Sequence, residues 1–170
     1  MAKTKLSQLT LGDLMNVTDK NRILKASQCT VELENIYHDI EPMSLIEKIK
    51  SFFLGRNIIN VYHITFKFKV ISDTKENHTV FIRIKPDYEL TNWTNNPAQV
   101  YCDCESFKYQ SAYLLNQYNS LFLNDKTRTA LGPAITQAPK NMARTSTLCK
   151  HSLAAVNFLV NNYASIMKTV

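Results

Sequence analysis

The chain of 170 residues lacks any uninterrupted apolar run of the roughly 18 residues that a membrane-spanning helix requires. Lysines near the first methionine are not followed by the apolar segment of a secretory signal peptide. Internal repeats and low-complexity tracts are lacking too. We therefore expect no membrane partner and no signal-directed secretion. With 45% apolar and 20% charged residues, the chain is able to bury a core.

Cysteine is also scarce. The chain has four cysteines, and three of them stand in a metal-like spacing with a histidine. Because no export signal is visible, a disulfide framework is not expected, and a reducing compartment fits the pattern better. The remaining histidines, His38, His63 and His78, have no ligand-like partners in the sequence and receive no role.

Alternation between apolar and polar residues predicts strands. Apolar side chains recur at every second position in residues 61–70, and the same period returns in residues 80–85. A polar turn over 72–78 separates the two segments, so we expect an antiparallel hairpin that stops at Pro86. A further short strand is expected over 99–104, around the first cysteine pair.

Helical spacing of apolar residues predicts three helices. The segment 41–55 is typical of an amphipathic helix with Pro42 in its first turn and Gly55 at its end. Residues 106–118 also favour a helix. The segment 147–170 predicts a long C-terminal helix, because its apolar residues recur on one side.

The other segments carry weaker patterns. Residues 1–27 are expected to form an N-terminal arm or a short helix, with the helix over 6–16 and a polar loop over 16–22. A short strand is expected over 28–36. Residues 124–147 contain Gly132 and two prolines and show no sustained period, so they predict a long loop.

The cysteines form two pairs of potential ligands, a CxC pair and a CxH pair. In an extended strand residues two apart point the same way, so Cys102 and Cys104 reach one ion if the chain kinks between them. On a helix residues two apart diverge by roughly 200°. We therefore expect Cys149 to precede or start the last helix and His151 to lie in its first turn, with the cap-type residues 145–147 before them.

Three thiolates and one imidazole are a donor set that suits tetrahedral zinc. We predict one structural Zn²⁺ that is bound by Cys102, Cys104, Cys149 and His151. Four protein ligands leave no open position for water, so we do not expect an enzyme. A chance arrangement of buried cysteines and a capping histidine is the alternative. Cys29 is expected to be a small core residue.

The order CxC, spacer and CxH at the start of a helix resembles the SWIM-type zinc finger. The resemblance rests on the four ligands within VYCDCESFKY and TLCKHSLAAV, and it covers residues 99–165 with 44 residues between the pairs. It implies a ββα arrangement in which zinc pins a strand, a loop and a helix.

A fuller pattern of CDCxSFKY, LGPAITQAPKN and LCKHSLAAV resembles small virion proteins of tailed phages. This second resemblance implies a non-enzymatic structural or assembly component of the virion, assembled in the reducing cytoplasm of the host. Its partners would be other virion proteins, in multiple copies within a symmetric assembly. The N-terminal arm and the 105–148 loop would supply the contacts.

The alternative hypothesis is a nucleic-acid-binding SWIM module. The net charge is +6, and residues 105–148 carry 5 Lys and Arg against 2 Asp and Glu. Seven cations would then contact phosphates: Lys67, Lys69, Arg83, Lys126, Arg128, Lys140 and Arg144. A solvated sheet face also explains the cations on the hairpin, so nucleic acid is not favoured.

Together these patterns predict an α+β fold. It would combine an antiparallel hairpin or small sheet, amphipathic helices, and the zinc-pinned strand, loop and helix of the C-terminal half. Residues 28–170 would form a single domain.

Overall fold

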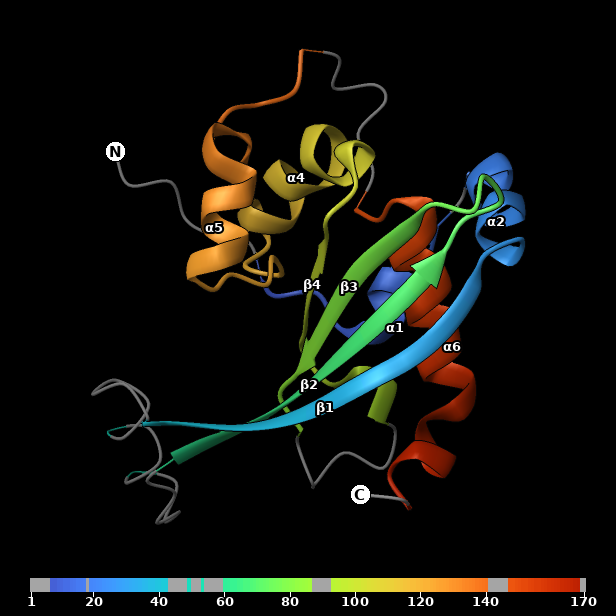
Figure 1. The fold of residues 1–170 in the computed structure, drawn as a ribbon. Coiled ribbons are helices and arrows are strands. Elements are labelled where there is room, and N and C mark those ends of the chain that lie inside the picture. Colours follow the sequence, from blue (N-terminus) through green and yellow to red (C-terminus); the bar gives the residue numbers. More distant parts are fainter. Residues whose placement is uncertain are drawn as a thin grey trace.

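A computed structural model describes residues 7–17, 19–42, 49, 53, 60–86, 93–140 and 147–168. The chain has the predicted α+β fold, with a four-stranded antiparallel sheet and several helices (Figure 1). The strands lie side by side in chain order. Their bounds are Thr30–Pro42 for β1, Asn60–Ile71 for β2, Asn77–Ile84 for β3 and Ala98–Cys102 for β4.

The predicted hairpin is confirmed by β2 and β3. The two strands are antiparallel, with Phe66 opposite Ile82 and Phe68 opposite Val80. These four side chains are fully buried on one face of the sheet, because the period of two places them together. The expected strand around the first cysteine pair is β4, which pairs with β3.

The first strand is longer than the sequence predicted. β1 continues past residue 36 and pairs with β2 as far as Pro42. The prediction that Pro42 begins a helix is therefore wrong. The rest of the predicted helix over 41–55 lies outside the described residues, except for Ile49 and Phe53, which are helical and exposed.

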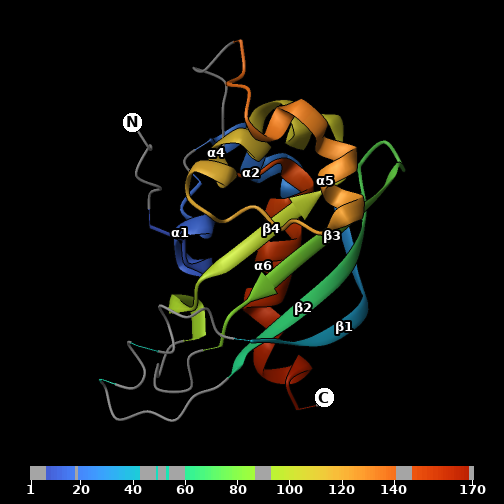
Figure 2. The ribbon, with the colours of Figure 1, turned by 90° about the vertical axis from the view of Figure 1, so that its left-hand side faces the viewer.

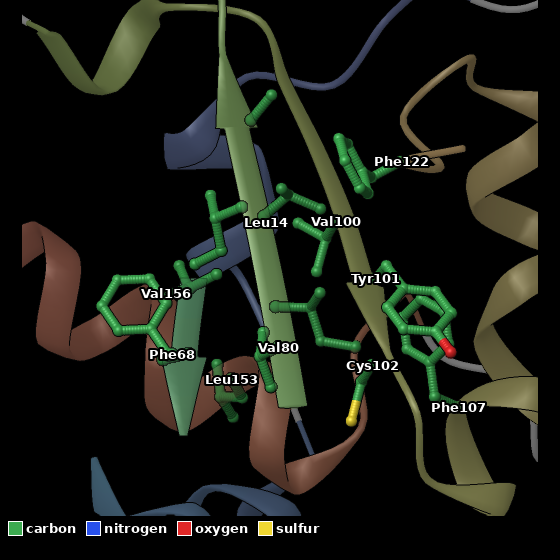
Figure 3. Packing of buried hydrophobic residues seen from close by; sticks show 14 of the residues in the cluster. Leu14, Phe68, Val80, Val100, Tyr101, Cys102, Phe107, Phe122, Leu153 and Val156 are labelled. Carbon is green, nitrogen blue, oxygen red and sulfur yellow. The ribbon is translucent and has the colours of Figure 1, made fainter. Parts of the chain in front are cut away.

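The long C-terminal helix is confirmed as α6 (Lys150–Ile166), which crosses one face of the sheet (Figure 2). Its apolar side packs on the buried face of β2: Phe158 contacts Phe68 edge-on, with 6.0 Å between ring centroids. Leu153 and Val156 belong to the same buried cluster (Figure 3). Burial of such side chains is the main stabilising term in a domain of this size.

Two helices precede the sheet. α1 (Leu11–Met15) lies within the segment for which an arm or a short helix was expected, and it buries Leu11 and Leu14 completely. α2 (Lys20–Ser27) begins inside the predicted loop over 16–22, so that prediction is wrong there. Asp19 explains the start of α2, since its carboxylate accepts hydrogen bonds from the backbone N–H groups of Asn21 and Arg22.

The second face of the sheet is covered near β4. A helical segment of residues 105–117 follows the strand and includes a π-helical turn, Phe107–Ser111, before α4 (Ala112–Gln117). Phe122 stacks on Phe81 of β3, with ring centroids 5.3 Å apart. Short 3₁₀ turns lie at Trp93–Asn95 and Gly132–Ile135. No helix among the described residues combines the length and the hydropathy of a membrane-crossing segment.

The predicted long loop over 124–147 is wrong in its first part, where α5 (Asp125–Leu131) forms. Asn124 caps this helix: its side chain accepts a hydrogen bond from Thr127 N at 2.9 Å, and Asn124 N donates to Thr127 Oγ1 at 2.8 Å. Thr127 and Leu131 are the residues that α5 buries. Residues 141–146 lie outside the described residues.

The capping box makes α5 sensitive to Asn124. We expect Asn124→Ala to lower the free energy of unfolding by about 1 kcal/mol, because the first turn of the helix loses an acceptor for its free N–H groups. Asn124→Asp keeps an acceptor and should change the free energy little. Urea denaturation of the two variants checks the difference, and equal losses in both would contradict the capping role.

Candidate metal centre

The two pairs of predicted ligands meet at one point of the fold. The possible ligand atoms of Cys102, Cys104, Cys149 and His151 all lie within 4.8 Å of one another, and all four residues are buried. The first pair comes from the end of β4 and the second from the start of α6. In Figure 3 the Cys102 side chain leaves β4 on the side opposite Tyr101 and Phe107.

The CxC pair is positioned by a break in the strand. β4 ends at Cys102, and Asp103 lies outside it, as the expected kink requires. Asp103 ties this kink to the start of β3, because Asp103 N donates to Thr79 O at 3.2 Å and Thr79 N donates to Asp103 Oδ2 at 2.9 Å. Cys104 then begins a helical turn, where its Sγ accepts a hydrogen bond from Phe107 N at 3.3 Å.

The CxH pair is positioned by the start of α6. Cys149 is itself the N-cap, with an extended backbone, and its Sγ accepts a hydrogen bond from Ser152 N at 3.4 Å. His151 lies in the first turn, as predicted. Thr147 is therefore not the cap, and residues 145 and 146 lie outside the described residues. The partial positive charge of the helix start stabilises a thiolate at Cys149.

Hydrogen bonding among the thiols favours one thiolate. Burial opposes ionisation of Cys149, yet hydrogen bonds from the side chains around it lower its pKa well below the usual thiol value, in the order Cys102, Cys104, His151 and Ser152. Burial raises the pKa of Cys102 well above the usual thiol value, and the hydrogen bonds of Cys102 with Cys104 and Cys149 raise it further. For Cys104, the hydrogen bond with Cys102 lowers the pKa. The hydrogen bond with Cys149 and the burial of the thiol outweigh that effect and raise the pKa of Cys104 to about 12.

The donor set fits a soft or borderline divalent cation. In a tetrahedral zinc site with Zn–S bonds of roughly 2.3 Å, the sulfur atoms stand roughly 3.8 Å apart, which agrees with the spread of the cluster. Both ring nitrogens of His151 are buried, and no carboxylate or carbonyl in the described part of the chain accepts a hydrogen bond from either of them. A metal cation bound to one of these two nitrogens would give that nitrogen a partner. The cluster is therefore a candidate metal site.

The pKa values predict how metal affinity depends on pH. Cys102 and Cys104 have raised pKa values, so both are protonated near pH 7 before a cation binds, and a divalent cation must displace both protons. Affinity should therefore rise with pH, with about two protons released per bound ion. Competition with a chelator between pH 6.5 and 8 measures this, and a pH-independent affinity would contradict it.

Charged residues surround the cluster. Lys150, expected to offset the negative charge of the site, forms an ion pair with Asp73 in the turn between β2 and β3. Arg22 of α2 donates a hydrogen bond to Leu148 O, directly before Cys149. An open cleft of about 840 Å³ lies beside the cluster and is lined in part by Arg22, Cys104 and His151.

The described cations that were proposed for nucleic-acid binding lie on β2, on β3 and in the segment after β4. Three of them pair with carboxylates of β1, the strand that the sequence prediction underestimated: Lys67 with Glu34 at 2.8 Å, Lys69 with Glu32 at 3.6 Å and Arg83 with Asp39 at 3.6 Å. Lys126 and Arg128 are exposed on α5, and Lys140 is exposed in the segment after the 3₁₀ turn Gly132–Ile135. Arg144 lies outside the described residues.

Two residues differ from their sequence interpretation. Cys29 is half-buried and packs at the margin of the core rather than inside it. His78, which received no role, lies against the metal site: its ring stacks on that of His151, with 3.9 Å between centroids. No spacing rule connects these two histidines, because they come from β3 and α6 and meet only in the folded chain.

The chain matches no protein-family model, no curated protein and no solved structure. The case for its function therefore rests on the candidate metal site and on the sequence motifs around it.

Proposed function

We propose that the chain is a zinc-stabilised structural or assembly component of a tailed-phage virion, which acts through protein–protein contacts and not through catalysis. The observation that carries the proposal is the buried cluster of three cysteines and one histidine that joins the end of β4 to the start of α6. Zinc is the proposed ion because structural zinc sites commonly use this donor set.

The position of the four candidate ligands supports a structural role. Together they would fill a tetrahedral coordination sphere, which leaves no position for a reacting water. They also join distant parts of the chain, since 44 residues separate Cys104 from Cys149. When bound, the ion would hold the sheet and α6 together at one end, and closing so long a loop limits the freedom of the unfolded chain.

The virion context rests on the resemblance of the CDCxSFKY, LGPAITQAPKN and LCKHSLAAV segments to small tailed-phage virion proteins. Exposed apolar side chains offer contact surface for such an assembly. Ile40 of β1 is 64% exposed, and Tyr109 in the helical segment after β4 is 58% exposed. Tyrosine is enriched at protein interfaces, and the buried centre of an interface is more apolar than the rest of the protein surface.

Two measurements test the proposal. Elemental analysis of protein purified without chelator should give one zinc per chain, and protein without bound metal would contradict the zinc site. Mass spectrometry of purified particles, from the phage that encodes the chain, should detect it at a defined copy number. A monomer that is absent from those particles would contradict the virion role while leaving the zinc site intact.

The nucleic-acid alternative predicts a different result. A module that contacts phosphates through several lysines and arginines should bind duplex DNA at 50 mM salt and lose affinity steeply by 200 mM. We expect no such binding, because Lys67, Lys69 and Arg83 are already paired with carboxylates of β1. Fluorescence anisotropy with a labelled duplex measures it, and steeply salt-dependent binding would favour the alternative.

A further inference from the structure

His78 and His151 form a flat ring contact at the candidate metal centre. Their ring centroids are 3.9 Å apart and the ring planes are inclined by 29°. His78 lies near the start of β3, on the face of the sheet that α6 covers, while His151 lies in the first turn of α6. The contact therefore connects the sheet to the helix beside the four possible ligands.

The stacked ring replaces a contact that histidine ligands ordinarily make. A metal-bound imidazole commonly donates its second N–H to a carboxylate or a carbonyl, and this hydrogen bond fixes the plane of the ring. Both ring nitrogens of His151 are buried, and neither donates to such an acceptor within the residues that the structure describes. Among the described residues, the ring of His78 stacks on the ring of His151. This stacking limits rotation of the His151 ring.

His78 is itself held in place by a carboxylate between two of the ligands. Its Nδ1 lies 3.1 Å from Oδ1 of Asp103, and the other oxygen of Asp103 accepts a hydrogen bond from Thr79 N. Glu76 lies farther away, with its Oε2 3.7 Å from Nε2 of His78. The side chain of His78 is only 16% exposed. Asp103 thus links the CxC turn to the ring that faces His151.

We propose that His78 is a positioning residue for the metal centre: held by Asp103, its ring lies flat against His151 and sets the plane of that ligand. The inference rests on the metal site proposed above and adds a residue from outside the coordination sphere to it. It also explains a carboxylate beside a cluster of thiolates. Asp103 adds negative charge beside the thiols, which opposes binding of three thiolates. Its role in this proposal is to hold the ring of His78, which in turn orients His151.

Two substitutions of His78 distinguish the effect of the stacked ring from the effect of the volume that the side chain fills. His78→Phe keeps an aromatic ring without a hydrogen bond, and His78→Leu fills a similar volume without a flat face. Residues that support a ligand from outside the coordination sphere change metal affinity by about 10-fold to 100-fold. We expect His78→Leu to weaken affinity within that range and His78→Phe to recover much of the loss.

The readouts are the dissociation constant for Zn²⁺, from competition with a chelator, and the visible absorption bands of the Co²⁺-loaded protein. The Co²⁺ bands report the geometry of the ligands, which a space-filling role would not alter. We expect the bands to shift in His78→Leu and to stay near the wild-type position in His78→Phe. His38→Leu is the matched control, because His38 is exposed on β1 opposite Ile64, away from the cluster.

The outcomes separate the two proposals. Wild-type protein that binds neither Zn²⁺ nor Co²⁺ would overturn the metal site and the role of His78 with it. Wild-type binding together with unchanged affinity and unchanged Co²⁺ bands in His78→Leu would overturn the positioning role alone. Equal losses in His78→Leu and His78→Phe would also overturn it, since the flat ring would then contribute nothing.

Discussion

Cys102→Ser should abolish metal binding and remove most of the stability of the domain. Structural zinc contributes on the order of 10 kcal/mol in small domains, while a whole domain is typically stable by about 5–15 kcal/mol. The serine hydroxyl is a poor ligand for zinc, and the remaining thiols would stay buried beside an incomplete site. We expect the free energy of unfolding to fall by on the order of 5 kcal/mol or more.

The measurements are zinc content by elemental analysis and thermal unfolding followed by circular dichroism. Cys29→Ser is the matched control, because Cys29 is a free, half-buried thiol outside the cluster. It should keep one zinc per chain and unfold near the wild-type temperature. A Cys102→Ser variant with full zinc content or an unchanged unfolding temperature would contradict the structural role of the ion.

The position of the cluster explains why we expect a large effect from one ligand substitution. Cys149 and His151 belong to the start of α6, and the same helix packs Leu153 and Val156 into the core that covers β2 and β3. Loss of the ion would free the end of this helix from β4. The loss of stability would therefore extend to the hydrophobic core and would not stay confined to a loop.

The sequence could predict those parts of the fold whose pattern is local and unbroken. The period of two in β2 runs without interruption, so the hairpin with β3 is visible in the residues alone. The meeting of the four candidate ligands could be predicted for a related reason, since each pair lies within three residues. Their chemistry and spacing restrict them to the end of a strand and the start of a helix.

Other parts were hidden by irregularities. A register shift between Leu33 and Asn35 breaks the alternation of β1, so its apolar positions change from odd to even numbers and the strand looks shorter than it is. α5 has seven residues and buries only Thr127 and Leu131, which is too few for a visible helical period. Asn124, the N-cap of α5, is the residue that could have indicated the start of a helix, but Gly132 and the two prolines favoured a loop.

The contact between His78 and His151 could not be predicted in any local way. It depends on the register of β3 against β4, which places Asp103 beside His78, and on the angle at which α6 crosses the sheet. Both are products of tertiary packing. Sequence spacing therefore identifies the candidate metal ligands, whereas the histidine that stacks on one of them is found only in the folded chain.

Leu14→Ala should cost about 2–5 kcal/mol of stability, as expected for removal of a large aliphatic side chain from a well-packed core. Leu14 is fully buried in the same cluster as the side chains of α6. The segment before α1 also pairs with β4, because Ala98 N donates a hydrogen bond to Leu9 O at 2.9 Å. Residues near the N-terminus thus complete the core.

Leu24→Ala is the matched control, since it makes the same change in α2 at a side chain that is 60% exposed. It should shift the free energy of unfolding by less than about 0.5 kcal/mol. Urea denaturation of both variants gives the comparison. If the segment that contains α1 were an arm that serves only to contact other subunits, Leu14→Ala would be as mild as Leu24→Ala. The loss would then appear in assembly and not in folding.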